Sequence, residues 1–190
     1  MDESPSDKNS LFPEADIRFA SFGSRLGASL LDGLINLAII LPVTYYNILI
    51  WKIPYLFVIT SLAQIAYKPF LEYRYGATLG KMAVGIEVLG HQFQRVSFNE
   101  EMKRVSFYIV PSFIQFILTV RIYFSPAFVS AKNYTEFNQL LVDANPSTLL
   151  LSGLVVMIVI ADCITFFLNN QGRSLHDLYA DTYVVEKMGR

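Results

Sequence analysis

Long apolar stretches dominate the chain, and short polar segments separate them. Each holds about twenty mostly apolar residues, the length that an α-helix needs to cross roughly 30 Å of hydrocarbon. The pattern predicts an all-α membrane protein, a bundle of four transmembrane helices at about residues 26–45, 54–71, 105–123 and 148–168. The second stretch is short and contains Lys68 followed by Pro69, so a buried or re-entrant segment is the alternative there.

The segment between the second and third spans follows a different pattern. Its β-branched residues stand at alternate positions, Val84, Ile86 and Val88. A turn with Gly90 and residues 93–98 follow, so we expect a small cytosolic β-hairpin, to which the tail 182–187 could add a third strand. Ser97 and Glu100 have the spacing of a capping box, which predicts the start of the helix that leads into the third span.

The stretch GATLGK, residues 76–81, has two glycines and a lysine. A phosphate-binding loop needs four residues between its glycines and a Ser or Thr after the lysine. Here three residues separate the glycines and Met82 follows the lysine, so we reject a phosphate site. We interpret the glycines as permitting a tight turn against the membrane.

The composition points to a lipid environment. Hydrophobic residues make up 53% of the chain and charged residues only 16%, against about 25% charged residues in soluble domains. The net charge of −1 gives no reason to expect nucleic acid as a partner. The single cysteine, Cys163, excludes an intrachain disulfide, and no Cys-x-x-Cys cluster indicates a metal, so we predict neither a metal nor a cofactor.

The distribution of Lys and Arg predicts the orientation. Cytoplasmic segments of membrane proteins carry an excess of basic residues. With both termini in the cytosol, residues 1–18 form a polar cytosolic lead and residues 19–186 the transmembrane domain. The cytosolic side then holds 12 basic residues and the outer side 3. The outer ones are Lys52, Arg121 and Lys132; the cytosolic ones are Lys8, Arg18, Arg25, Lys68, Arg74, Lys81, Arg95, Lys103, Arg104, Arg173, Lys187 and Arg190.

Two aspartates fall inside predicted spans. A charge deep in a bilayer costs on the order of 3 kcal/mol or more, so such residues are candidates for function. Asp32 follows Arg25 by seven residues, nearly two helical turns, and Asn36 shares that face. Asp162 lies in the fourth span, where an interhelical hydrogen bond explains it equally well.

The segment after the fourth span is unusually rich in ionisable groups. Arg173, His176, Asp177 and Asp181 lie within nine residues, at the surface where Arg25 begins the first span. Asp177 can pair with Arg25 there. Such a pair is either an electrostatic staple between helix ends or part of a binding site, and both interpretations remain open.

Three motifs carry a resemblance to a known family: SRLGASLLDGLI, GATLGKMAVGIEVL and GRSLHDLYADTYVV. Together they resemble the RDD family of bacterial membrane proteins, which is named for one arginine and two aspartates. Arg25 and Asp32 match the first two positions. Asp177 matches the second aspartate, with Asp162 as the alternative, and Asp181 stands where the family usually has a glycine. The resemblance implies a multi-pass inner-membrane protein suggested to take part in transport; some relatives have been linked to sodium/proton exchange.

The first function hypothesis is a transport-associated protein that binds an ion or small solute at Arg25, Asp32 and Asp177. Asp162, Asn36, Arg173 and His176 are secondary candidates. The alternative is a non-transporting assembly or scaffold subunit, and in either case we expect a homo-oligomer or a subunit of a membrane complex. We do not predict an enzyme, because an intramembrane protease built on Asp32 and Asp162 would carry a Gly-x-Gly-Asp element, whereas VIA precedes Asp162.

Overall fold

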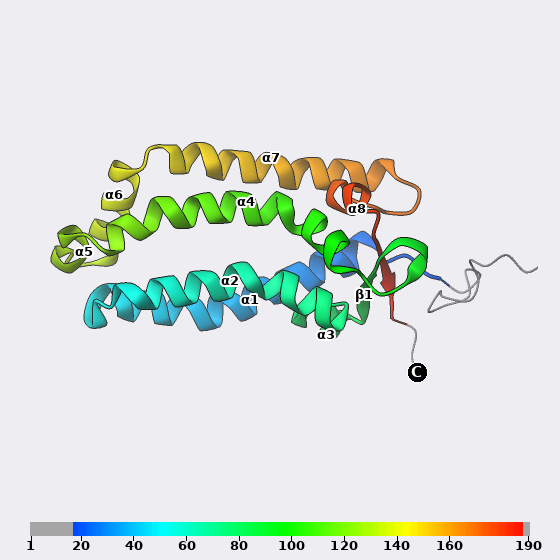
Figure 1. The fold of residues 1–190 in the computed structure, drawn as a ribbon, viewed down its shortest axis with the longest axis horizontal. Helices are drawn as coiled ribbons and strands as arrows, with labels where there is room; N and C mark the ends of the chain where they lie inside the picture. The colour runs from blue at the N-terminus through cyan, green and yellow to red at the C-terminus, as the bar shows by residue number, and fades with distance from the viewer. Residues whose placement is uncertain (1–16, 188–190) are drawn as a thin grey trace, which may run out of the picture. The chain divides into compact units, whose positions relative to one another are not determined.

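The computed structural model describes residues 17–187, so the predicted N-terminal lead lies almost wholly outside the described residues. The long helices are α1 (Phe22–Tyr46, continued by a π-helical turn, Asn47–Trp51), α2 (Pro54–Tyr75), α4 (Phe98–Tyr123) and α7 (Ser147–Leu168), as Figure 1 shows. The short helices are α3 (Leu79–Val84), α5 (Pro126–Ser130), α6 (Tyr134–Ala144) and α8 (Leu175–Ala180). The protein is therefore mostly helical, as the apolar pattern predicts.

Three helical segments of the described chain are long and apolar enough to cross a membrane: Phe22–Trp51, Phe98–Tyr123 and Leu149–Leu168. They expose large apolar side chains such as Leu30 and Leu150 (61% and 78% exposed), which suits contact with lipid rather than with water. The expected second span forms helix α2, but α2 does not reach the same apolar character.

The chain divides into two compact units. The first, which we call the sheet unit, comprises the described residues 17–33, 67–107 and 159–187. The second, the loop unit, comprises residues 34–66 and 108–158 and includes α5 and α6. A buried apolar cluster of the loop unit packs the connection after α4 against the end of the first helix: Ile48, Ile122, Tyr123, Phe128, Ala131 and Phe137.

The small sheet differs from the predicted hairpin. Strand β1 (Ile86–Leu89) pairs antiparallel with β2 (Tyr183–Glu186), which belongs to the C-terminal tail. The hairpin prediction was wrong for residues 93–98, because they contribute only one bridge, between Leu89 and Arg95. A 3₁₀ turn at His91–Phe93 ends the run of extended backbone, whereas Val184 and Val185 of the tail are buried in the sheet unit.

The predicted capping box before α4 is confirmed. The backbone N–H of Glu100 donates to Ser97 Oγ at 3.3 Å, and the backbone N–H of Ser97 donates to Glu100 Oε2 at 2.7 Å. The two side chains thereby satisfy backbone donors that would otherwise be unpaired at the helix start. The start of α4 is thus set by local sequence, and it positions the first turns of this helix within the sheet unit.

Candidate functional site

Asp177 is the centre of a buried ion cluster in the sheet unit. It occupies the first turn of α8, where its carboxylate accepts hydrogen bonds from Ser174 N (3.3 Å) and Ser174 Oγ (3.0 Å). Arg25 of α1 donates to Asp177 Oδ2 at 2.5 Å, and Arg104 of α4 donates to Oδ1 at 3.1 Å. Burial alone would raise the pKa of Asp177, but His176, Arg104 and Arg25 hold that pKa well below its ordinary value.

The cluster continues from Arg104 into two further helices. Arg104 is fully buried and also donates to Glu72 of α2, which accepts a second bond from Lys81 Nζ of α3 at 2.9 Å. Burial and then the charge of Arg104 lower the pKa of Lys81 to about 8, although Glu72 acts in the opposite sense. We call the series Arg25–Asp177–Arg104–Glu72–Lys81 the ion-pair chain; it joins α1, α8, α4, α2 and α3.

Asp32 belongs to a second group of hydrogen bonds. Its half-buried carboxylate accepts from Tyr67 Oη (2.7 Å), Thr78 Oγ1 (2.6 Å) and the backbone N–H of Gly80 (2.7 Å). Thr78 is the N-cap of α3 and Gly80 lies in its first turn, so Asp32 binds a backbone N–H at the helix start that has no partner within the helix. Asp32 therefore fastens α2 and α3 to α1.

The approach of α3 to α1 explains one glycine of GATLGK. A Cβ atom added at Gly80 would lie 2.1 Å from the carbonyl oxygen of Ala28 and 2.8 Å from Cγ of Asp32. Only glycine permits this contact. The structure thus distributes the predicted Arg25, Asp32 and Asp177 cluster over two hydrogen-bonded groups, one around Asp177 and one at the start of α3.

The secondary candidates have separate positions. Asp162 of α7 accepts from the backbone N–H of His176 (3.2 Å) and contacts His176 Nδ1 (2.8 Å), so it ties α7 to α8. Burial lowers the pKa of His176, against the effects of Asp177 and Asp162. Asn36 lies half-buried on the part of α1 that belongs to the loop unit.

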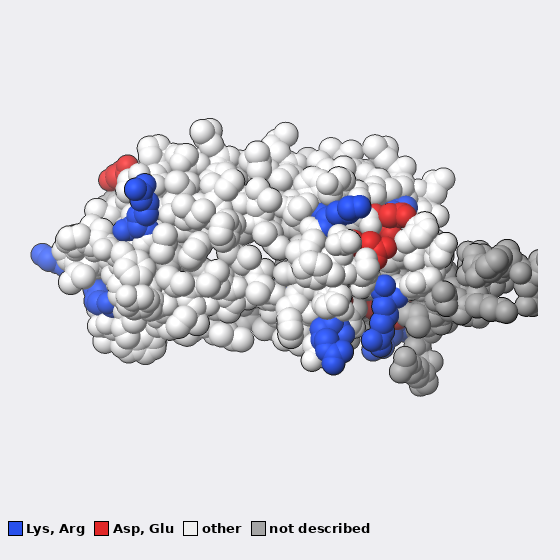
Figure 2. Space-filling model, viewed as in Figure 1, with Lys and Arg blue, Asp and Glu red and all other residues white. Residues whose placement is uncertain are grey.

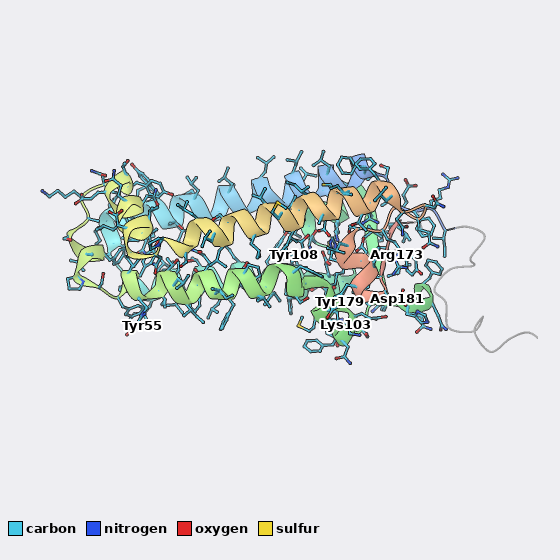
Figure 3. All side chains as sticks on the ribbon, turned by 90° about the horizontal axis from the view of Figure 1, so that it is seen from above. Tyr55, Lys103, Tyr108, Arg173, Tyr179 and Asp181 are labelled. Atoms are coloured by element: carbon cyan, nitrogen blue, oxygen red, sulfur yellow. The ribbon has the colours of Figure 1, made fainter. Side chains whose placement is uncertain are left out.

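Arg173 organises the turn between α8 and β2. Its guanidinium donates to Asp181 Oδ1 (2.8 Å), to the carbonyl oxygen of Asp177 (3.2 Å) and to that of Thr182 (3.1 Å); Figure 3 labels Arg173 and Asp181. Asp181 ends α8 with φ of 53°, the left-handed conformation that glycine adopts most easily. This geometry gives a physical reason for a glycine at the position, and here Asp181 uses its side chain to bind Arg173 and His91.

Glu101 is the exception among the buried ionisable groups. It lies one turn before Arg104 on α4 and is 0% exposed, yet within the described residues neither of its carboxylate oxygens has a hydrogen-bond partner. The charges that act on it most strongly are Glu72, Arg104, Lys68 and Lys81. Figure 2 shows other acidic and basic side chains exposed at the end of the molecule where Figure 1 labels α8 and β1. A buried carboxylate without a hydrogen-bond partner is unusual, because burial of an unpaired charge is unfavourable.

Sequence reasoning missed four members of this site: Glu72, Lys81, Glu101 and Arg104. The capping box at Ser97 predicts that a helix begins there, but the stretch NEEMKR that follows is equally typical of an exposed amphipathic helix face. The one available signal was the spacing of Glu101 and Arg104, which places both on one face of α4. Within residues 17–187, no three His, Cys, Asp or Glu side chains lie close enough together to hold a metal ion.

The structure defines a membrane-type protein with apolar helices and a buried charged cluster that joins five of its helices. The chain belongs to the RDD family, whose model matches residues 19–181. That match includes Arg25, Asp32, Asp162 and Asp177. No curated protein and no solved structure matches the chain.

Proposed function

We propose that this RDD-family protein is a transport-associated protein of the inner membrane in which Glu101 binds and releases a proton. The ion-pair chain holds the surrounding helices in place but does not itself bind the transported species. The observation that carries the proposal is the fully buried carboxylate of Glu101, which has no hydrogen-bond partner among the described residues. An ionisable side chain on a membrane-spanning helix is a functional candidate by default.

Asp177 and Asp32 are less suited to bind an ion or solute. Asp177 already accepts bonds from two arginines and from Ser174, and Asp32 accepts from three donors. Taking one partner away from a buried ion pair costs about 3–5 kcal/mol. Glu101 can take up a ligand without losing any hydrogen bond.

A proton suits Glu101 better than a metal cation. Arg104 on α4, Lys81 on α3 and Lys68 on α2 act on Glu101 with positive charge, and they would repel a cation at that place. A proton needs no shell of ligands and removes the charge that burial disfavours. The same basic groups attract the ionised carboxylate. Burial therefore stabilises the protonated form of Glu101, whereas the neighbouring positive charges stabilise the ionised form.

A flux experiment tests this role. The purified protein in liposomes with an enclosed pH indicator should carry protons when a membrane potential is imposed. Glu101→Gln keeps the size of the side chain but cannot ionise, so we expect the variant to fold and the flux to disappear. Glu100→Gln is the matched control, because Glu100 is already bonded to Ser97 and Gln retains an acceptor there.

Equal proton flux in the wild type and Glu101→Gln would contradict the proposal. Absence of flux in the wild type, together with a partner protein that co-purifies in fixed stoichiometry, would favour the assembly-subunit alternative. The first result requires proton flux in the wild type and the second requires its absence, so the experiment separates them.

The proposed topology has four spans with both termini in the cytosol. Helix α2 has 22 residues, which at about 1.5 Å per residue is long enough to cross the hydrocarbon. Its charged residues Lys68, Glu72 and Arg74 all lie in its last two turns, and Glu72 is neutralised by Arg104 and Lys81. The excess of basic residues in the predicted cytosolic segments supports this orientation.

Cysteine labelling tests the orientation. In a Cys163→Ser background, single cysteines replace Tyr134 and Arg95, both exposed. An impermeant thiol reagent added to intact cells should label the cysteine at position 134 and leave that at position 95 unlabelled. The reverse pattern would overturn the orientation.

A further inference from the structure

The loop unit contains a cavity of about 540 Å³ between α2, α4 and α7. Half of the residues that line it are polar but uncharged: Ser61, Gln64, Ser112, Gln115, Thr119 and Ser152. The aromatic rings of Phe57 and Phe116 lie among the others, with ring centroids 5.9 Å apart and an interplanar angle of 14°. The cavity thus combines a flat apolar wall with several hydrogen-bonding groups.

Three polar side chains of this cavity, those of Ser61, Gln64 and Ser112, differ from other hydroxyls on the same helices. Thr60 Oγ1 donates to the carbonyl of Leu56 at 2.8 Å, and Thr165 Oγ1 donates to that of Ala161 at 2.7 Å, so both are satisfied by their own helix. Within residues 17–187, the side chains of Ser61, Gln64 and Ser112 have no such partner. Polar groups on apolar helices at membrane depth are tolerated where they meet another polar group or line a cavity that contains one.

We infer that this cavity binds a small uncharged molecule that carries an amide or hydroxyl group on an apolar, preferably aromatic, body. None of the residues lining the cavity carries a charge, so a charged ligand would enter without compensation. The free amide of Gln64 offers both a donor and an acceptor, which an amide or alcohol can match. Gln115 already donates to Thr119 Oγ1 at 3.1 Å, which orients the second amide of the wall.

The size of the cavity agrees with this class of ligand. Small-molecule sites usually occupy about 300–1,000 Å³ and combine apolar walls with a few placed polar groups. The inference goes beyond the proposed proton site, because all the lining residues belong to the loop unit and Glu101 belongs to the sheet unit. Either proposal can therefore fail without the other.

Three matched probes test the inference: benzamide, benzoate and benzamidinium, which share a size and differ in charge. The full chain in lipid nanodiscs is titrated with each probe and followed by ligand-observed NMR. We expect saturable binding of benzamide and binding of the two charged probes weaker by about tenfold or more, because burial of an uncompensated charge costs more than loss of a hydrogen bond.

Gln64→Leu removes the unpaired amide at nearly constant volume. It should weaken benzamide binding about fivefold to tenfold, the effect of losing a hydrogen bond to the ligand. Thr60→Val is the matched control, since Thr60 lies outside the lining and is bonded within its helix. A thermal unfolding measurement checks that Gln64→Leu is folded. If it is not, Ser61→Ala is used instead, and it should also weaken benzamide binding.

Several results would overturn the inference. The first is the absence of saturable benzamide binding up to its solubility limit, which would mean that the cavity holds water or lipid only. The second is binding of benzoate or benzamidinium as strong as that of benzamide. The third is unchanged benzamide binding in both Gln64→Leu and Ser61→Ala, which is the result that partition into the lipid would give.

Discussion

The surroundings of Asp177 and of Glu101 differ sharply, although both carboxylates belong to the sheet unit and both are 0% exposed. Asp177 accepts hydrogen bonds from Arg25, Arg104 and Ser174. Glu101, on the same helix as Arg104, has no hydrogen-bond partner among the described residues. The comparison teaches that burial alone does not decide what a carboxylate does in this fold: the bonds of Asp177 hold helices together, whereas the lack of bonds at Glu101 is the basis of the proposed proton site.

The largest expected effect on stability comes from breaking the ion pairs of Asp177. Arg104→Met removes the guanidinium that Asp177 and Glu72 share, and leaves two buried carboxylates with fewer partners. We expect the free energy of unfolding to fall by about 3–5 kcal/mol, the cost of breaking a buried ion pair. Chemical unfolding in detergent, followed by circular dichroism, measures the change.

The neighbouring Lys103 provides the control for Arg104. Its side chain is exposed (Figure 3), and Lys103→Met should change the stability by less than about 0.5 kcal/mol, as for most surface substitutions. If Arg104→Met were as stable as Lys103→Met, the ion-pair chain would not be the structural element that we describe.

A second test concerns the hydrogen bonds of Asp32, which join α3 to α1. Gly80→Ala places a methyl group 2.1 Å from the carbonyl oxygen of Ala28, so α3 must move away from α1 and the bonds of Asp32 must stretch. We expect a loss of about 1–3 kcal/mol, typical of overpacking. The measurement is again the free energy of unfolding.

Gly33 is the matched control for Gly80, because a Cβ atom there meets no other atom within 4 Å. Gly33→Ala in the middle of α1 should stabilise the protein by up to about 1 kcal/mol, the helix propensity difference between the two residues. Effects of the same sign and size at both positions would refute the close approach of α3 to α1.

The sequence alone was sufficient where the signal is local. The apolar runs predict α1, α4 and α7, and the Ser97–Glu100 spacing predicts the start of α4, because length, hydropathy and capping are properties of neighbouring residues. The pairing of Arg25 with Asp177 also follows once the family resemblance places both at the same surface.

The rest depends on contacts between distant segments. Strand β1 had an equally plausible local partner in residues 93–98, and only the burial of Val184 and Val185 decides for the tail. Arg104 meets Asp177 across 73 positions, and no pattern near Arg104 distinguishes a buried arginine from a solvated one. Glu101 was missed for the same reason, since only its surroundings in the fold show that it is buried without a hydrogen-bond partner among residues 17–187.

A smaller effect should appear in the pH dependence of stability. Burial lowers the pKa of His176 below its usual 6.5, so the unfolded chain binds this proton more readily and stability should begin to fall as the pH drops below 6.5. The pKa of Asp177 is held well below 3.8, so its contribution is complete above 3.8 and is lost only at lower pH.

Thermal unfolding at a series of pH values, in a Glu101→Gln background that removes the titration of Glu101, checks this order. We expect two separate declines, and His176→Gln should remove only the first. A single decline that His176→Gln leaves unchanged would show that the protonation of His176 is not linked to folding.

The most direct test of the central claim is infrared spectroscopy of the lipid-reconstituted protein during a pH titration. A protonated carboxyl group has a carbonyl stretch that a carboxylate lacks, so each buried acid that changes its protonation state gives a difference band. The account predicts a reversible, pH-dependent band that disappears in Glu101→Gln and persists in Glu100→Gln. A band that survives in Glu101→Gln, or no titrating band in the wild type, would contradict the claim that Glu101 is the proton-binding group.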